Sequence, residues 1–200
     1  MNHNIFLIRH AKTETNFLRK YIGVTDDQLC ESGITELKKC ISSGHYPAVD
    51  YVFVSPLLRC QQTREMIYNG VPFEIIPELA ECDFGIFENM NYEQLKDTRE
   101  YQNWINNGVK GNFPQGENIE DFKSRCAAGF EKAVTKIIEK RIVDCALVIH
   151  GGTIMAILEK YDRERSNFHD WKLENCEGYK LLLETGIWNK EKKLTEIIKL

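Results

Sequence analysis

Two short apolar runs, far apart in the sequence, both end in a histidine. Phe6–Ile8 leads directly into Arg9 and His10, and Ala146–Ile149 leads into His150. Apolar runs this short are typical of buried sheet strands. Because ligands bind beyond the carboxyl ends of the strands in open α/β sheets, we expect both histidines at one edge of a sheet. An isolated Arg-His pair would more simply mark a strand that ends at the surface; the second strand-end histidine is what favours a site.

Strand and helix patterns alternate along the rest of the chain. Further strands are expected at 51–54, 73–76, 179–184 and 194–198, and helices at 13–20, 31–43, 57–69, 117–139 and from 151 onward. This alternation predicts an α/β fold with a central, mostly parallel sheet. The last two strands are expected to form a hairpin-like edge, joined through Thr185-Gly186 and a lysine-rich turn. Residues 87–115 are polar with scattered aromatic residues, and we expect one or two short helices there, forming a cap beside the site.

Composition limits the class of protein and its partners. The 200 residues, 42% hydrophobic and 28% charged, predict one globular domain spanning residues 1–200. The net charge is −4, whereas proteins that bind nucleic acid or anionic membranes usually carry a clustered excess of basic residues. An anionic ligand would therefore need a local binding site. No apolar run approaches the roughly 20 residues that cross a bilayer, and residues 1–4 lack signal-peptide features. We therefore expect a cytoplasmic protein without nucleic-acid or membrane partners.

The chain has seven cysteines, an odd number, and the two nearest in sequence are ten residues apart. Zinc sites usually pair their ligands at much shorter spacings, so no metal ion is expected. We interpret the cysteines as free thiols in a reducing compartment. They are Cys30, Cys40, Cys60, Cys82, Cys126, Cys145 and Cys176.

A third strand-to-helix junction carries Arg59. A serine-proline turn follows the strand at 51–54, and Arg59 falls in or near the first turn of the next helix, where free backbone N–H groups and the helix dipole favour an anion. Alone, Arg59 would be read as a surface residue; beside the other two junctions it becomes a phosphate-ligand candidate. Gly151, directly after His150, lets backbone N–H groups approach the same anion closely.

Convergence of these junctions would form a pocket with two guanidinium groups and two imidazoles. Guanidinium binds phosphate oxygens bidentately, so phosphate suits the pocket. The sequence has no Walker motif, no H-E-x-x-H and no paired aspartate ligands, which argues against nucleotide-triphosphate and metal mechanisms and leaves covalent catalysis by histidine. A proton donor is expected in the acidic segment that follows the strand at 73–76. The residues alone leave Glu78, Glu81 and Asp83 open.

Four separated blocks occur along nearly the whole length: Arg9-His10 with Thr13 and Asn16, Ser55-Pro56-Leu57 with Arg59 and Thr63, Glu81 with Phe84-Gly85, and His150-Gly151-Gly152. In this order they resemble the histidine phosphatase superfamily, which includes the cofactor-dependent phosphoglycerate mutases. The resemblance implies a three-layer α/β/α sandwich of the phosphoglycerate mutase type, with a small helical cap. It also implies a reaction that needs no cofactor.

The resemblance further implies roles for single residues. His10 would be the phosphorylated nucleophile, and Glu81, rather than Glu78 or Asp83, would be the proton donor. The phosphoryl group would be held by Arg9, Arg59 and His150, with a contact from Asn16. Loop positions that line the substrate pocket are matched by Thr13 and Gly23.

Three positions depart from the family pattern. Ala11 stands where glycine usually follows the histidine, Phe87-Glu88-Asn89 replaces a Trp-Glu-Gly turn, and Asn118 stands at a usual serine. Ala11 would tighten the pocket by a methyl group, and Asn89 would need a positive φ, which asparagine tolerates better than most residues. None of these changes removes a phosphate-binding or proton-transfer group.

Two reactions compete within this family. A phosphatase admits water to the phospho-enzyme, whereas a mutase excludes it and returns the phosphoryl group to a bound intermediate. The short chain and cap favour a phosphatase of small-molecule phosphate monoesters. The cap sequence resembles that of α-ribazole phosphatases, which act in assembly of the cobalamin lower ligand; a broad-specificity sugar-phosphate or nucleotide phosphatase is nearly as well supported. The alternatives are a mutase and a non-catalytic protein that binds a phosphorylated ligand, and a homodimer is left open.

Overall fold

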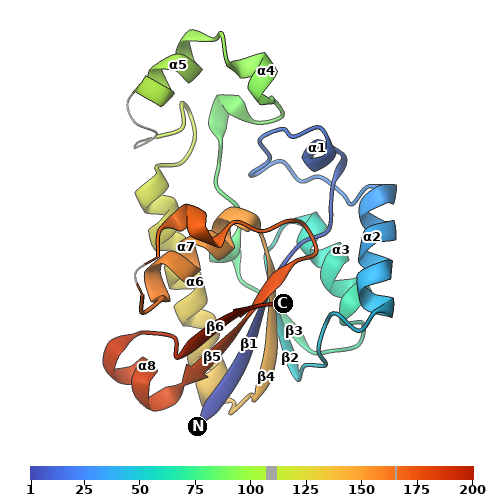
Figure 1. Cartoon of the computed structure of the whole chain (residues 1–200), viewed down its shortest axis with the longest axis vertical. Coiled ribbons are helices and arrows are strands. Elements are labelled where there is room, and N and C mark those ends of the chain that lie inside the picture. The colour runs from blue at the N-terminus through green and yellow to red at the C-terminus, as the bar shows by residue number, and fades with distance from the viewer. Residues whose placement is uncertain (107–111, 165) are drawn as a thin grey trace.

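A six-stranded sheet runs through the molecule in the computed structural model, which describes residues 1–106, 112–164 and 166–200 (Figure 1). In order across the sheet, the strands are β3 (Phe73–Ile75), β2 (Tyr51–Val54), β4 (Asp144–Ile149), β1 (Asn2–Arg9), β5 (Gly178–Glu184) and β6 (Glu196–Lys199). The first four are parallel to one another, whereas β5 and β6 pair antiparallel. The prediction of an α/β fold with a mostly parallel sheet is confirmed.

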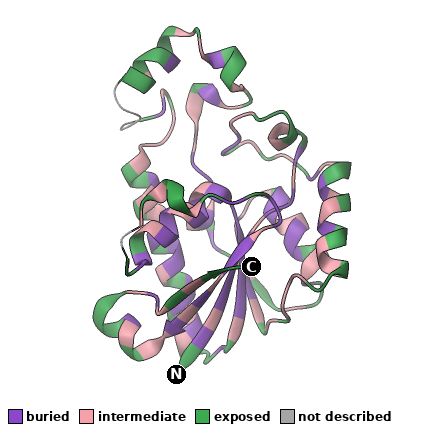
Figure 2. Cartoon of the chain, viewed as in Figure 1, coloured by how far each residue is buried: buried purple, intermediate pink, exposed green. Residues whose placement is uncertain are grey.

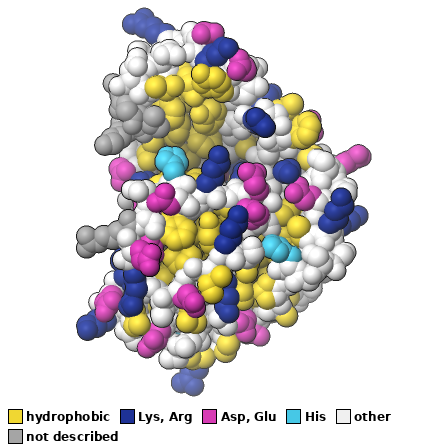
Figure 3. All heavy atoms as spheres, in the orientation of Figure 1, with side chains coloured by type: hydrophobic (Ala, Val, Ile, Leu, Met, Phe, Trp, Pro, Cys, Tyr) yellow, Lys and Arg dark blue, Asp and Glu magenta, His cyan; other side chains and the backbone are white. Residues whose placement is uncertain are grey.

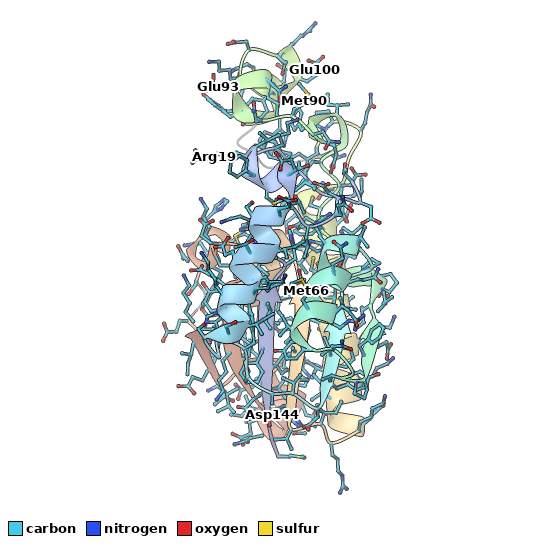
Figure 4. The ribbon with its side chains drawn as sticks, turned by 90° about the vertical axis from the view of Figure 1, so that its right-hand side faces the viewer. Arg19, Met66, Met90, Glu93, Glu100 and Asp144 are labelled. Atoms are coloured by element: carbon cyan, nitrogen blue, oxygen red, sulfur yellow. The ribbon has the colours of Figure 1, made fainter. Side chains whose placement is uncertain are left out.

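Alternate residues of the strands face two separate helical layers. The helices that cover the sheet are α2 (Glu31–Ser42), α3 (Leu58–Ile67), α6 (Ile119–Glu139) and α7 (Gly151–Tyr161). Ile5 and Leu7 of β1 lie in one core cluster with α6 and α7, whereas Phe6 and Ile8 lie in a second cluster with α3. Met66 of α3 lies between α2 and α3, in a third cluster (Figure 4). Figure 2 shows the central strands as largely buried between these layers, which is the expected three-layer sandwich.

The strands β1 and β4 are neighbours and end at the same level. Arg9 lies opposite Ile149 in parallel register, and the His10 backbone N–H donates to the Ile149 carbonyl over 3.0 Å. His10 and His150 therefore leave the same edge of the sheet side by side. This is the arrangement that the two apolar runs predicted.

The connection between β5 and β6 differs from the prediction. The expected Thr185-Gly186 and lysine-rich turn folds instead as α8 (Thr185–Glu191), which ends at Lys192 with a left-handed φ of 52°. The reason is Trp188, whose side chain is only 2% exposed and whose ring centroid lies 5.0 Å from that of Tyr161. Burial of one large aromatic side chain outweighs the turn-like local sequence.

Two short helices stand beyond the carboxyl edge of the sheet (Figure 1): α4 (Tyr92–Leu95) and α5 (Arg99–Asn106). They belong to the predicted cap at 87–115, of which 107–111 lie outside the described residues. The rings of Phe87, Tyr101, Trp104 and Phe113 form one cluster there, with neighbouring centroids 4.9–6.1 Å apart. In Figure 3, hydrophobic side chains gather on the visible face just below the top of the cap.

The remaining helical elements are short. They are α1 (Glu14–Phe17), which is shorter than the helix expected at 13–20, and the 3₁₀ turns η1 (Pro77–Leu79), η2 (Gly85–Phe87) and η3 (Phe168–Trp171). Among the described helices, none has the length and apolar character needed to cross a bilayer.

Candidate active site

His10 directly follows the last residue of β1, and its side chain is held in one orientation. Its Nδ1 lies 2.7 Å from the carbonyl oxygen of Ala11, and the residue is 3% exposed. Because a carbonyl oxygen can only accept, Nδ1 must carry the proton and donate it. The lone pair of the ring is therefore on Nε2. The sequence could not identify this acceptor.

The charge state of His10 follows from its surroundings. Burial lowers the pKa of His10 well below its ordinary value of 6.5, and the charges of Arg59 and Arg9 lower it further. The hydrogen bond to the Ala11 carbonyl acts in the opposite direction but is the smallest of these effects. The imidazole is therefore neutral at neutral pH, and the Nε2 lone pair is free to react.

Arg59 lies in the first turn of α3 and is fully buried. Its Nη1 donates to the Thr25 carbonyl and its Nη2 to the Gly23 carbonyl, each over 2.8 Å. The Nε is also buried, and it has no partner among the described residues. An unpaired buried donor costs about 1–3 kcal/mol, so an anion that accepts from Nε would relieve that cost.

Arg9 is held from a different part of the chain. Its Nη1 donates over 2.6 Å to the carbonyl of Leu173, in the segment between η3 and β5, and its buried Nε likewise lacks a partner within the described part of the chain. Burial lowers the pKa of Arg9, while the charge of Glu81 raises it. A Cβ on Gly151 would lie 3.2 Å from this Nε, so the absence of a side chain there leaves Arg9 room against the start of α7.

His150 faces His10 across the edge of the sheet. The two ring centroids are 5.2 Å apart, with the ring planes at 64°. The Ser55 hydroxyl lies 2.6 Å from Nε2 of His150, and the Cys60 thiol lies 3.4 Å from the same nitrogen. Burial is the main cause that lowers the pKa of His150 well below 6.5, and Arg59 lowers it further. This second imidazole is neutral too.

Glu81 is an acidic residue that the structure places beside Arg9 and Arg59. It is 8% exposed, and its carboxyl oxygens accept from the backbone N–H of Cys82 over 3.1 Å and of Gly152 over 3.0 Å. Burial raises the pKa of Glu81 above its ordinary value, and these two hydrogen bonds and the charges of Arg59 and Arg9 only partly offset that effect. Such a carboxyl stays protonated to a higher pH than an exposed one.

The other two acidic candidates are engaged elsewhere. Glu78 pairs with Lys132 of α6 over 3.3 Å, at a partly exposed position, and the pKa of Glu78 is lowered. Asp83 accepts from the backbone N–H of Gly85 over 2.8 Å and so shapes the start of η2. Of the three carboxylates that the sequence left open, Glu81 alone is placed with the strand-end arginines.

Three other predicted substrate contacts have structural partners. Thr13 and Asn16 form a capping box around α1: the Asn16 N–H donates to Thr13 Oγ1 over 3.2 Å, and the Thr13 N–H donates to Asn16 Oδ1 over 3.3 Å. Thr13 is fully buried. Gly23 takes part through its carbonyl, which holds Arg59, and a Cβ there would lie 1.7 Å from the Cys82 oxygen. All of these contacts are made within the protein, so the role of Thr13, Asn16 and Gly23 toward a substrate stays a prediction.

Two residues at the site carry no clear signal in the sequence. Asn175 donates over 2.9 Å to the backbone carbonyl of His10 and is buried, although it is 165 residues away in the chain. Ser55 was identified in a turn and in the motif Ser55-Pro56-Leu57 without a role of its own, yet its hydroxyl orients His150. Contacts of this kind depend on the tertiary fold, so no local pattern could reveal them.

Together these residues can bind and transfer an anionic group. Two guanidinium Nε donors lack partners, a neutral imidazole offers its lone pair, and a buried carboxyl keeps its proton to a higher pH than an exposed one. These are the parts that phosphoryl transfer to a histidine needs. Across the described residues there is no group of three or more metal-ligating side chains, and the seven cysteines are free.

Comparison with known proteins points in the same direction. The sequence profile of the histidine phosphatase superfamily (branch 1) matches residues 5–193. A broad-specificity phosphatase of Saccharomyces cerevisiae is 30% identical over 175 residues, which cover 82% of this chain and 73% of the yeast protein. A protein of Cronobacter sakazakii, named a probable phosphoglycerate mutase, is 29% identical over 127 residues, which cover 60% of this chain and 58% of that protein.

Solved structures share the whole fold at lower sequence identity. The α-ribazole phosphatase from Shigella flexneri matches with a TM-score of 0.79 and 21% identity, over 98% of this chain and 96% of that one. The phosphoglycerate mutase from Bacillus anthracis str. Sterne matches with a TM-score of 0.76 and 18% identity, over 92% and 88% of the two chains. At these identities the likeness shows the fold alone.

Proposed function

Because the chain belongs to the histidine phosphatase superfamily, we propose that it is a phosphatase that hydrolyses small-molecule phosphate monoesters through a phosphohistidine at His10. The observation that carries the proposal is the state of His10. Its Nδ1 proton is held by the Ala11 carbonyl, its ring is neutral, and unpaired arginine donors lie beside it. Each of these is what a nucleophile toward a phosphate ester requires.

In the first half-reaction, Nε2 of His10 attacks phosphorus in line with the leaving oxygen. The N–P bond forms as the bond between phosphorus and the ester oxygen breaks. Arg9 and Arg59 donate to the non-bridging oxygens and balance the charge on them. Protonated Glu81 gives its proton to the departing alkoxide, which leaves as the alcohol.

In the second half-reaction, water attacks the phosphohistidine. Glu81, now a carboxylate, takes a proton from that water as the new P–O bond forms and the N–P bond breaks. His10 recovers its lone pair, inorganic phosphate leaves, and Glu81 is protonated again. We propose that turnover needs no metal ion, because the two guanidinium groups already supply the positive charge that the transferring group requires.

Hydrolysis is preferred over mutase activity on two grounds. The yeast relative that is 30% identical is named a broad-specificity phosphatase, and its match covers more of both chains than that of the mutase-named relative. The cap places two short helices, α4 and α5, beyond the sheet edge. A mutase remains the second candidate, because one relative carries that name.

The substrate is proposed to be α-ribazole 5'-phosphate. The cap sequence and the fold of the Shigella flexneri α-ribazole phosphatase support this choice. The hydrophobic side chains that Figure 3 shows below the top of the cap suit a leaving group that carries an aromatic ring. A broad-specificity sugar-phosphate or nucleotide phosphatase is the competing assignment.

The deciding experiment is phosphate release from an aryl phosphate in the presence of EDTA, comparing wild type with His10→Ala and Glu81→Gln. We expect EDTA-resistant turnover that is lost with His10→Ala and weakened with Glu81→Gln. Acid-labile labelling should give a phosphohistidine, and α-ribazole 5'-phosphate should lead a substrate panel. Isomerisation of 3-phosphoglycerate without phosphate release would favour the mutase, and binding without either reaction would favour a phospho-ligand binding protein.

Two further proposals concern the whole chain. We propose that residues 1–200 fold as a single domain, since α6 and α7 on one face and α3 on the other cover the same sheet. We also propose a cytoplasmic location, which the seven free cysteines support because oxidising compartments favour disulfides.

A further inference from the structure

The carboxylate of Glu88 is enclosed by backbone and hydroxyl donors. Its Oε1 accepts from the N–H groups of Gly23 over 2.9 Å, of Val24 over 3.2 Å and of Phe84 over 3.2 Å. Its Oε2 accepts from the Thr25 hydroxyl over 2.6 Å and from the Thr25 N–H over 3.4 Å. Residues 23–25 therefore wrap around one negative charge.

Two of these three residues, Gly23 and Thr25, also hold Arg59. The carbonyls of Gly23 and Thr25 accept its two terminal nitrogens over 2.8 Å each. With their N–H groups directed to Glu88 and their carbonyls directed to Arg59, these peptides link the two side chains. Because the guanidinium is planar, fixing both terminal nitrogens also fixes the direction of the unpaired Nε.

The backbone around Glu88 keeps this link in place. Asn89 has a φ of 63°, as its position in the sequence suggested, and its side-chain amide donates to the Thr25 hydroxyl over 3.2 Å. The Asn89 N–H donates to the Tyr21 carbonyl over 2.9 Å, and the Tyr21 N–H donates to the Met90 carbonyl over 3.0 Å. Figure 1 shows these two segments side by side, where the N-terminal loop meets the base of the cap.

We propose that Glu88 is a positioning residue that aims Arg59 at the phosphoryl group by ordering residues 23–25. This inference rests on the proposed function only because it takes the pocket of Arg59 to be a phosphate site. Glu88 itself touches neither phosphate nor leaving group. Its removal frees residues 23–25, the two carbonyls lose their fixed direction, and Arg59 no longer presents Nε to the anion.

The test measures the dissociation constant of inorganic orthophosphate by calorimetry, together with kcat and KM for an aryl phosphate. Wild type is compared with Glu88→Ala, Glu88→Gln and the control Glu93→Ala. Glu93 is a cap carboxylate that pairs with Lys96 at an exposed position, toward the outer end of the cap (Figure 4). We expect Glu88→Ala to weaken orthophosphate binding at least about tenfold, since a misplacement of about 1 Å can cost a hundredfold. Glu88→Gln should lose less, and Glu93→Ala should match wild type.

A double-mutant cycle separates positioning from general stabilisation. If Glu88 acts through Arg59, Glu88→Ala should have little further effect on orthophosphate binding in an Arg59→Lys background. Additive losses, or a lower melting temperature with unchanged orthophosphate binding, would overturn the proposal. Should Glu88→Ala fail to fold, Glu88→Gln carries the same cycle, because it keeps the oxygen that receives three N–H donors.

The outcomes also distinguish this inference from the proposed function. Wild-type turnover with unaltered Glu88 variants would leave the phosphatase standing and remove the positioning role. If wild type bound orthophosphate without turning over a substrate, and the Glu88 variants bound it more weakly, the positioning role would stand and the phosphatase would not. A wild type that neither binds orthophosphate nor releases it would refute both.

Discussion

A single backbone carbonyl decides which nitrogen of His10 can react. Ala11 follows His10 in sequence and accepts a hydrogen bond from its Nδ1–H, so the proposed nucleophile and the group that orients it come from adjacent residues. Glu81 depends on more distant groups, because its carboxyl is held by the N–H of Gly152 at the start of α7. The two proton-carrying groups of the proposed reaction are thus fixed by different parts of the fold.

The first prediction concerns pH. His10 must be neutral to attack, and since its pKa is lowered well below 6.5, activity should fall only as the pH drops through that low value. Glu81 must be protonated, and since its pKa is raised, activity should persist above the ordinary glutamate range and fall as the pH rises through the raised value. We therefore expect kcat/KM for an aryl phosphate to have an acidic optimum.

Glu81→Gln should remove the alkaline limb of that profile and lower the maximum by about 10²–10⁴-fold, the usual contribution of a general acid. The acidic limb should be unchanged, because it belongs to His10. An alkaline limb of the same shape in Glu81→Gln would contradict the assignment of Glu81.

The second prediction concerns the space around Glu81. A Cβ on Gly152 would lie 2.5 Å from Glu81 Oε1 and 3.1 Å from its Cδ, so Gly152→Ala should displace the carboxyl. We expect kcat to fall by up to about a hundredfold while KM changes little. Gly186→Ala is the matched control, because the nearest atom to its Cβ would be 3.9 Å away. Equal activity of the two variants would show that Glu81 tolerates displacement.

At this scale, the sequence predicted the residues that end strands and missed those that the tertiary fold brings in. Arg9, His10 and His150 were recognised because each directly continues an apolar run. Glu81 could not be separated from its acidic neighbours by residue pattern, because its burial depends on α7. Asn175 was missed because the contact with His10 spans 165 residues.

Among the elements, α8 shows where local sequence and tertiary packing disagree. Its residues read as a turn, but Trp188 is buried against Phe130 of α6 and Tyr161 of α7, with ring centroids 5.8 Å and 5.0 Å away. The strands were predicted well because a buried strand needs a continuous apolar run, which is visible locally. The start of α6 lies two residues later than predicted, and α1 ends three residues earlier than predicted.

The third prediction follows from that packing. Trp188→Ala should lower the free energy of unfolding by about 3–5 kcal/mol, the usual cost of truncating a buried aromatic side chain. Urea denaturation measures it, and Ile198→Ala, at a position 45% exposed, should change stability by less than about 0.5 kcal/mol. Because α8 lies at the opposite end of the molecule from the cap (Figure 1), the kcat of folded Trp188→Ala should equal that of wild type. A lower kcat would show that α8 acts on the site.

For the whole molecule, the residue pattern predicted a mostly parallel sheet and a site at the edge where parallel strands end together, and the family resemblance supplied the three-layer order. It did not predict how the cap connects to the sheet edge. That connection runs through Glu88 and residues 23–25, whose pairing joins segments about sixty residues apart.

The fourth prediction concerns the effect of orthophosphate binding on the free energy of unfolding. Orthophosphate that binds only the folded state should stabilise it by about 2.7 kcal/mol at a hundred times its dissociation constant. For a chain of this length, that corresponds to a rise in melting temperature of about 5–10 °C. Arg59→Ala should abolish most of the rise. A melting temperature independent of orthophosphate in wild type would argue against a preformed anion site.

The pairing of β1 also determines when the proposed site can assemble. Asn4 of β1 pairs with Asp144, and Asn2 pairs with Glu184, so the strand that carries His10 has its neighbours near the other end of the chain. Loop closure over such distances is slow, and these contacts must wait for most of the polypeptide. During synthesis, His10 leaves the ribosome long before His150, Asn175 and β5. A partly made chain therefore has no assembled pocket. The onset of phosphate release would show that β1 has paired with β4 and β5.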